Sequence, residues 1–140
     1  MILVDTCVII DVLQNDARWA DWSQEKLESH ALNHALVINA VIYSELSVGF
    51  SRIEAMDAML QQTQITVAPI PREALFLAGK VFQRYKARGG TRTGTLPDFF
   101  IGAHAAVLGI ALLTRDVERY ASNFPTVQLI APAMRQPSTR

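Results

Sequence analysis

The sequence predicts an α/β fold in which a central, mainly parallel β-sheet is flanked by helices. Five short apolar runs have the length and composition of buried strands. Segments with helical spacing or helix-start signals separate these runs, and such alternation is typical of a parallel sheet covered on both faces. The chain has 140 residues, half of them hydrophobic, which is enough for one domain with its own core.

The expected elements follow one another without an internal repeat. We expect strands over residues 2–4, 36–38, 65–67, 110–113 and 127–130. We expect helices over residues 8–13, 16–32, 40–49, 53–62, 71–88, 97–108 and 117–121. These elements indicate one domain over residues 1–131, followed by a polar, flexible tail over 132–140.

Helix-start residues support several of these boundaries. Asn39 fits the N-cap of one helix, and Asn15 or Asp16 fits the N-cap of the helix before it. Pro97 suits the first turn of its helix. A loop rich in glycine and threonine, residues 89–95, separates the two longest helices of the second half.

The composition and charge of the chain argue against several classes of function. The net charge is zero, with 13 basic and 13 acidic residues, so nucleic acid would have to bind through a local patch. No apolar run reaches the roughly 18 residues of a membrane helix, and Asp5 and Asp11 interrupt any secretory signal. The single cysteine, Cys7, cannot form an internal disulfide, so we expect a cytoplasmic protein without membrane contact. No Cys/His spacing suggests zinc.

Two acids follow strands of the expected sheet. Asp5 comes directly after strand 2–4, and Asp116 comes soon after strand 110–113. Ligands of parallel sheets bind at the carboxyl ends of the strands, so both acids lie where chemistry is expected. Either could instead be a helix cap, of the helix near Val8 or of the one near Val117.

Two further acids lie on helix faces that should pack on the core. Glu45 belongs to a stripe at helical spacing, formed by Ile38, Val41, Ile42, Glu45, Val48 and Gly49. Asp98 belongs to a second stripe, formed by Asp98, Ile101, Gly102, Ala105 and Leu108. Buried acids need a partner or a metal. The alternatives are an ion pair or a solvent-reaching position for Glu45, and a capping role for Asp98 behind Thr95.

Four acids gathered at one place would repel one another, and a divalent cation is the simplest compensation. All-oxygen ligands favour a hard ion, Mg²⁺ or Mn²⁺. The residues therefore indicate a metal site.

The same motifs resemble those of PIN-domain nucleases. Asp5-Thr6 follows an apolar strand, Ser44-Glu45-Leu46 lies in a helix, Leu96-Pro97-Asp98 precedes Ile101-Gly102-Ala103, and Thr114-Arg115-Asp116 follows another strand. Each motif is short, but four in the right order over residues 1–130 make a strong match. Their spacing is most similar to that of the toxins of VapBC-type toxin–antitoxin pairs, so the resemblance implies a PIN-like fold.

The resemblance implies a Mg²⁺-dependent endoribonuclease, with Mn²⁺ able to substitute, that hydrolyses RNA through a metal-activated water. It implies that Asp5 and Asp98 are metal ligands and that Glu45 and Asp116 complete the site. It also implies an RNA substrate, a cognate antitoxin and a homodimer.

Four neighbouring residues are candidates for orienting the substrate or the site. Thr6 and Thr114 match hydroxyl positions of the family that orient water or the carboxylates. Arg92 could contact phosphates from the loop 89–95, or that loop could be a flexible linker. Arg115 could hold RNA or form an ion pair with Glu118 or another neighbour.

Cys7 is a departure from the resemblance, because the family often has Asn or Ser at this position. It also bears on one alternative, a haloacid-dehalogenase-type phosphatase, which needs a second Asp where Cys7 stands. The other alternative is a non-catalytic RNA- or protein-binding module with a PIN-like fold. Cys7 counts against the phosphatase, and the complete acidic set counts against the binding module.

Overall fold

The computed structural model describes residues 1–91 and 96–133, and it confirms the α/β fold. The described strands form one parallel sheet in the order β3-β2-β1-β4-β5. The strands are β1 (Ile2–Val4), β2 (Leu36–Ile38), β3 (Thr66–Val67), β4 (Ala111–Leu113) and β5 (Leu129–Ile130). The helices are α1 (Thr6–Leu13), α2 (Ala20–Ala31), α3 (Ala40–Ser47), α4 (Ile53–Thr63), α5 (Arg72–Ala87), α6 (Pro97–Leu108) and α7 (Glu118–Ala121).

The strand order creates a crevice between β1 and β4. The chain leaves β1 toward β2 on one side, and it leaves β4 toward β5 on the other. Val4 pairs with Leu113, so the carboxyl ends of the two strands lie side by side. At such a switch point the connections diverge to opposite faces of the sheet, and they leave room for a ligand between them.

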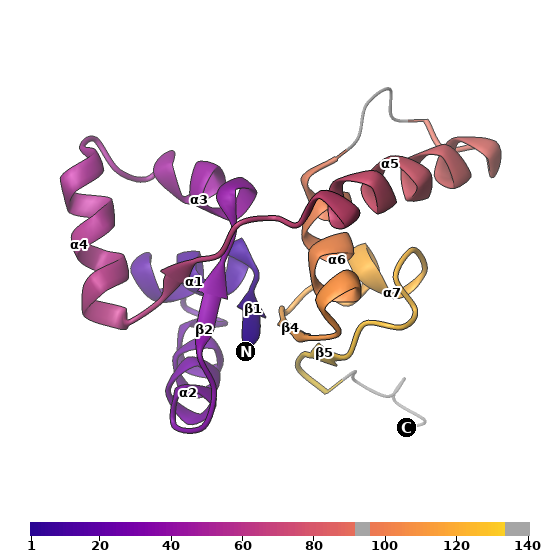
Figure 1. Cartoon of the computed structure of the whole chain (residues 1–140). Coiled ribbons are helices and arrows are strands. Elements are labelled where there is room, and N and C mark those ends of the chain that lie inside the picture. The colour runs from indigo at the N-terminus through magenta and orange to yellow at the C-terminus, as the bar shows by residue number, and fades with distance from the viewer. Residues whose placement is uncertain (92–95, 134–140) are drawn as a thin grey trace, which may run out of the picture.

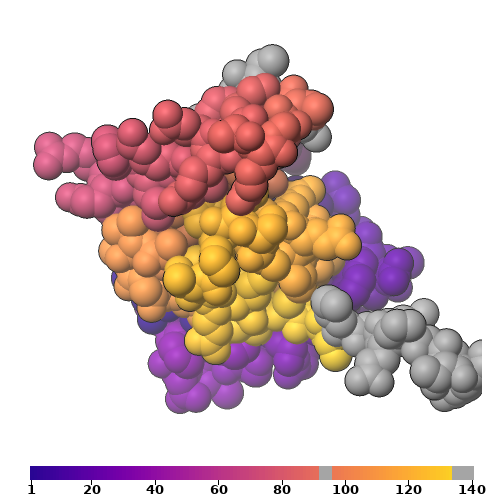
Figure 2. Space-filling view, turned by 90° about the vertical axis from the view of Figure 1, so that its right-hand side faces the viewer, coloured from indigo at the N-terminus to yellow at the C-terminus, as the bar shows by residue number. Residues whose placement is uncertain are grey.

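Helices cover the sheet in two groups (Figure 1). Helix α1 packs against α2, and α5 packs against α6, which also contacts β4. Figure 2 shows α5 as a ridge lying across α6 and the C-terminal segment. Between the layers, every residue of β1 and β2 is buried, as the apolar runs predicted.

Asn39 and Asp16 show one correct and one wrong prediction of a helix start. Asn39 is the N-cap of α3, and its side chain accepts a hydrogen bond from the Ile42 amide at 3.0 Å. Asp16 does not start α2, which begins at Ala20. Its carboxylate instead accepts from the amides of Arg18 and Trp19, so it closes a turn before the helix.

The buried face of α3 differs from the predicted stripe. Ile42 and Leu46, four residues apart, pack into the core, whereas Val48 is 88% exposed. Val48, the C-cap of the helix, keeps right-handed helical dihedrals, so it follows the helical spacing but has no core packing against it. Glu45 lies beside the core face and is only partly buried.

Within the described residues, no helix is long and apolar enough to cross a membrane. Most of the predicted tail, residues 132–140, lies outside the described part of the chain.

Candidate active site

Asp5 is the most enclosed of the four predicted acids, with 1% of its surface exposed. It is the N-cap of α1, and its Oδ1 accepts from the Thr6 amide at 2.8 Å. Its Oδ2 accepts from the hydroxyl of Thr114 at 2.8 Å and from the hydroxyl of Tyr120 at 3.0 Å. Asp5 therefore caps α1, as the capping alternative predicted. The second oxygen, however, is held by donors from the far side of the crevice.

Cys7 lies beside this carboxylate as a protonated thiol. Its Sγ is 3.7 Å from Oδ2 of Asp5. Burial and the neighbouring charge of Asp5 raise the pKa of the thiol to about 11, against smaller opposing effects that include Thr114 and Arg115. A thiolate nucleophile at this position is therefore excluded near neutral pH.

Glu45 reaches the same edge from α3. Its Oε1 accepts a hydrogen bond from the Thr6 hydroxyl at 2.6 Å. Thr6 thus contacts two of the acids, Asp5 through its amide and Glu45 through its hydroxyl. The short contact fixes α3 relative to the first turn of α1.

Asp98 lies in the first turn of α6 and is partly buried. Burial raises its pKa, Arg119 opposes that rise, and the charges of Asp5, Glu45 and Asp116 add to it. The other three acids are therefore close enough to affect the ionisation of Asp98. Leu96 is the N-cap without a side-chain bond, and Thr95 of the predicted cap lies outside the described residues.

Asp116 completes the group from the loop after β4. Its amide donates to the Thr114 hydroxyl at 3.0 Å, and its Oδ2 is 2.8 Å from Nε of Arg119. The capping alternative is wrong for this residue, because Val117 is the N-cap of α7 and no side chain caps that helix. The carboxylate of Asp116 instead pairs with Arg119.

Arg115 is held by a buried partner that the sequence analysis did not identify. Its Nε is 2.8 Å from Oδ2 of Asp11, whose surface is only 2% exposed. The Ser23 hydroxyl donates to the same oxygen at 2.9 Å, and the guanidinium lies 5.7 Å from the ring of Trp19. Arg115 therefore forms an ion pair, but its partner is Asp11 and not the predicted Glu118. The other predicted arginine, Arg92, lies outside the described residues.

Tyr120 and Arg119 are two further residues of this edge that the sequence analysis missed. Tyr120 is fully buried, and burial raises the pKa of its hydroxyl, which therefore stays a donor to Asp5. Arg119 stands three residues after Asp116, a spacing that brings side chains together on a helix. That spacing was the available signal for Arg119, whereas nothing local distinguishes Tyr120 from a core aromatic residue.

A buried polar pair connects the helices that carry Glu45 and Asp98. Asn39 Nδ2 lies 3.1 Å from Nδ1 of His104, and both side chains are fully buried. Because the Asn39 oxygen already accepts from Ile42, its amide nitrogen donates to the ring. Burial lowers the pKa of His104, which keeps the ring neutral and suits it as an acceptor.

The donor set of the four acids fits a hard divalent cation, because it consists of carboxylate oxygens alone. The described residues nevertheless contain no ready group of three metal-ligating side chains. In this arrangement the oxygens of Asp5 are hydrogen-bonded to the protein, and Arg119 lies between Asp98 and Asp116.

A groove of about 830 Å³ opens beside these acids. Its apolar lining comes from α1 and from the segment after α3, and it includes Ile10, Leu13, Val48 and Phe50. Thr6, Glu45 and Arg119 also line it. The groove thus joins an apolar surface to the acidic edge.

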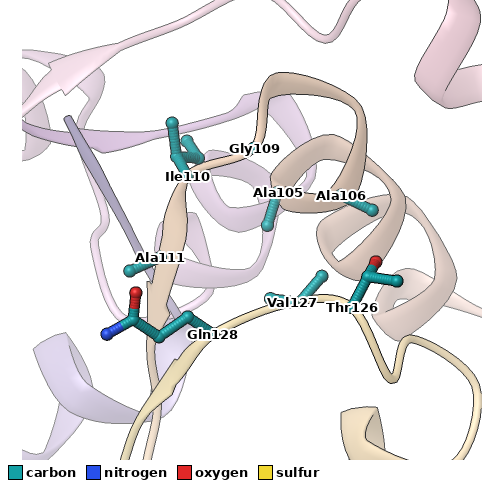
Figure 3. Close-up of a pocket in the computed structure, with 8 residues that line it drawn as sticks. All are labelled: Ala105, Ala106, Gly109, Ile110, Ala111, Thr126, Val127 and Gln128. Carbon is teal, nitrogen blue, oxygen red and sulfur yellow. The ribbon is translucent and has the colours of Figure 1, made fainter.

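A smaller cavity of about 200 Å³ lies at the other end of β4 (Figure 3). Small side chains line it, among them Ala105, Ala106 and Ala111. The acids follow the carboxyl ends of the strands, so this cavity is separate from the candidate site.

Comparison with known proteins finds a family and several similar folds. The family model described as PIN domain matches residues 2–122. VapBC2 from Rickettsia felis, bound to a promoter DNA fragment, matches with a TM-score of 0.72 and 18% identity over 94% of this chain and 99% of that chain. VapBC-1 from nontypeable Haemophilus influenzae gives 0.69 and 22% over 94% and 98%. FitAcB from Neisseria gonorrhoeae gives 0.68 and 20% over 92% and 96%. No curated protein matches the chain in sequence.

Proposed function

Because this chain belongs to the PIN-domain family, we propose that it is a metal-dependent endoribonuclease and the toxin of a bacterial toxin–antitoxin pair. One observation carries the proposal: at the switch point of the sheet, three acids from separate segments act on a fourth, Asp98. Besides burial, the charges of Asp5, Glu45 and Asp116 raise the pKa of Asp98. Like charges are costly to gather, which supports a role that needs them together.

The proposed cofactor is Mg²⁺, with Mn²⁺ able to substitute. Asp5, Glu45, Asp98 and Asp116 would hold the ion, since all four supply hard oxygen donors. A bound divalent cation supplies charge stabilisation for the phosphate and lowers the pKa of water.

The chain's own residues orient this site. Thr6 positions Glu45, and Thr114 and Tyr120 hold Asp5 from the opposite side of the crevice. In the metal-free protein burial and Asp5 keep the pKa of the Cys7 thiol raised, and water is the proposed attacking group. Arg92 and Arg115 are proposed to contact RNA phosphates, Arg115 while it remains paired with Asp11.

Cleavage of RNA by the purified protein tests the enzyme. The parent should cleave with Mg²⁺ or Mn²⁺ and stop in excess EDTA, and Asp98→Asn should be inactive while folded. A matched control, Asp21→Asn, removes an exposed acid from the first turn of α2 and should cleave like the parent. Water attack predicts a 5′-phosphate and a 3′-hydroxyl. Undiminished cleavage in EDTA would refute the metal mechanism, and no cleavage under any metal would favour the binding-module alternative.

The proposed partners are a cognate antitoxin and a second copy of the chain. Similar folds are found in VapBC complexes, which supports an antitoxin partner. The groove beside Glu45 would suit an amphipathic antitoxin segment that places a basic side chain among the acids. Exposed apolar residues such as Ile53 and Phe76 support a homodimer, which light scattering would test.

Expression in a bacterial host tests the toxin role separately. The active chain, expressed in the cytoplasm, should arrest growth of the host, and Asp5→Ala should not. The cognate antitoxin should restore growth by binding the chain directly. Harmless expression of protein that cleaves RNA in vitro would contradict the toxin role and leave the nuclease intact.

A further inference from the structure

Arg119 forms a bridge between two acids from different parts of the chain. Its Nε lies 2.8 Å from Oδ2 of Asp116, in the loop after β4. Its Nη1 lies 3.9 Å from Oδ1 of Asp98, in the first turn of α6. One guanidinium thus spans two of the four carboxylates proposed to bind metal.

Arg119 is also the resident counter-charge of the site. Within residues 1–91 and 96–133, no other basic side chain comes within 4 Å of these four acids, because the neighbouring Arg115 is paired with Asp11. A guanidinium stays charged at physiological pH, so Arg119 is attracted by the two carboxylates that it contacts.

A metal ion and this guanidinium would compete for the same two carboxylates. Both are cations, and Arg119 takes an oxygen of Asp116 at hydrogen-bond distance. A divalent ion bound to Asp98 and Asp116 would displace and repel the arginine. Half of the Arg119 side chain is exposed, so it can leave without breaking core packing.

The groove is where a displaced Arg119 would go. Arg119 lines this groove together with Thr6 and Glu45. A guanidinium binds phosphate through two parallel hydrogen bonds, as it binds carboxylates. An RNA strand approaching the acids needs such a group, because its phosphates are repelled by the carboxylates.

We propose that Arg119 is a charge-exchange residue: it holds Asp98 and Asp116 in the metal-free protein, and it binds an RNA phosphate once metal takes those carboxylates. This inference rests on the proposed nuclease function. Arg119 would thus have two successive partners, first carboxylate and then phosphate, and both are anions that accept paired hydrogen bonds from a guanidinium.

Calorimetric titration of the metal-free protein with Mn²⁺ tests the first half. Arg119→Gln should bind Mn²⁺ about fivefold more tightly than the parent, because the competing charge is gone. Arg119→Lys keeps the charge and should stay closer to the parent. The matched control is Arg52→Gln, which removes an exposed arginine 3.6 Å from Glu54 and should leave Mn²⁺ binding unchanged.

Steady-state cleavage of a short RNA in saturating Mn²⁺ tests the second half. Arg119→Gln and Arg119→Lys should raise KM severalfold with a smaller change in kcat, because each loses the two-pronged phosphate contact. Equal Mn²⁺ affinity in the parent and Arg119→Gln would overturn the exchange. Tighter Mn²⁺ binding with an unchanged KM would overturn the phosphate role. A parent that binds no Mn²⁺ would instead contradict the proposed function, and the exchange with it.

Discussion

Removing the hydroxyl of Tyr120 tests how strongly the fold depends on holding Asp5. Tyr120→Phe deletes one fully buried oxygen that donates to Asp5 Oδ2 at 3.0 Å, and it leaves the ring in place. A hydrogen bond to a charged group contributes about 1.5–3 kcal/mol. Thr114 donates to the same oxygen and remains, so we expect a loss near the lower end, about 1.5–2 kcal/mol. For a domain of this size that corresponds to a melting temperature lower by roughly 5–8 °C.

Thermal and urea unfolding measure this loss, and Tyr43→Phe is its matched control. The Tyr43 hydroxyl donates to Asp57 at 2.8 Å, but on the exposed surface, where water replaces the lost partner. Tyr43→Phe should therefore melt close to the parent. The reasoning is that burial makes the hydrogen bonds to Asp5 strongly stabilising. Equal melting temperatures of Tyr120→Phe and the parent, or equal losses of stability in the two variants, would refute it.

Two further predictions concern packing and the second buried acid. Gly102→Ala should destabilise the protein by about 1–3 kcal/mol, because the new Cβ would lie 2.3–2.8 Å from ring atoms of Phe124. Gly79→Ala, in α5 with open space around it, should leave urea stability equal or higher. Arg115→Met should cost about 1–3 kcal/mol in the same assay, since Asp11 would keep its buried charge without the cation; unchanged stability would contradict that pair's role.

The sequence was most informative about the sheet and its edge. The strands near Ile2, Leu36 and Ala111 are apolar runs whose short length favours strands over helices. The Asn39 cap is a local hydrogen bond. Once the strands are parallel, Asp5 and Asp116 follow carboxyl ends at the same edge of the sheet. Only the structure shows that these two strands are neighbours. These features depend on residues close together in the chain, so local patterns predict them.

Contacts between distant segments were not predictable in this way. Tyr120 reaches Asp5 across 115 positions, and Arg115 reaches Asp11 across 104. From the sequence, Tyr120 and Arg115 could each have been a surface or a core residue, because their sequence neighbours do not indicate which residue they contact. The wrong expectation for Val48 has a related cause: the residue keeps helical dihedrals, but whether other segments pack over it depends on tertiary structure that helical spacing does not include.

The central claim, that four acids share one cation, is tested most directly by thermal melting in EDTA and in saturating Mn²⁺. Above its folded pKa, the ionised Asp98 lowers stability, because burial and the other acids raise that pKa. That cost is relieved as pH falls through the raised value toward the unfolded one. In EDTA at neutral pH, Asp98→Asn should therefore melt no lower than the parent.

Mn²⁺ should raise the melting temperature of the parent. At ten times Kd, a cation bound only to the folded state adds about 1.4 kcal/mol, which is roughly 4–6 °C for this chain. Asp98→Asn should gain much less, whereas Asp21→Asn, which lacks an exposed acid of α2, should gain as much as the parent. An equal shift in the parent and Asp98→Asn, or no shift in either, would contradict a shared cation site at this edge of the sheet.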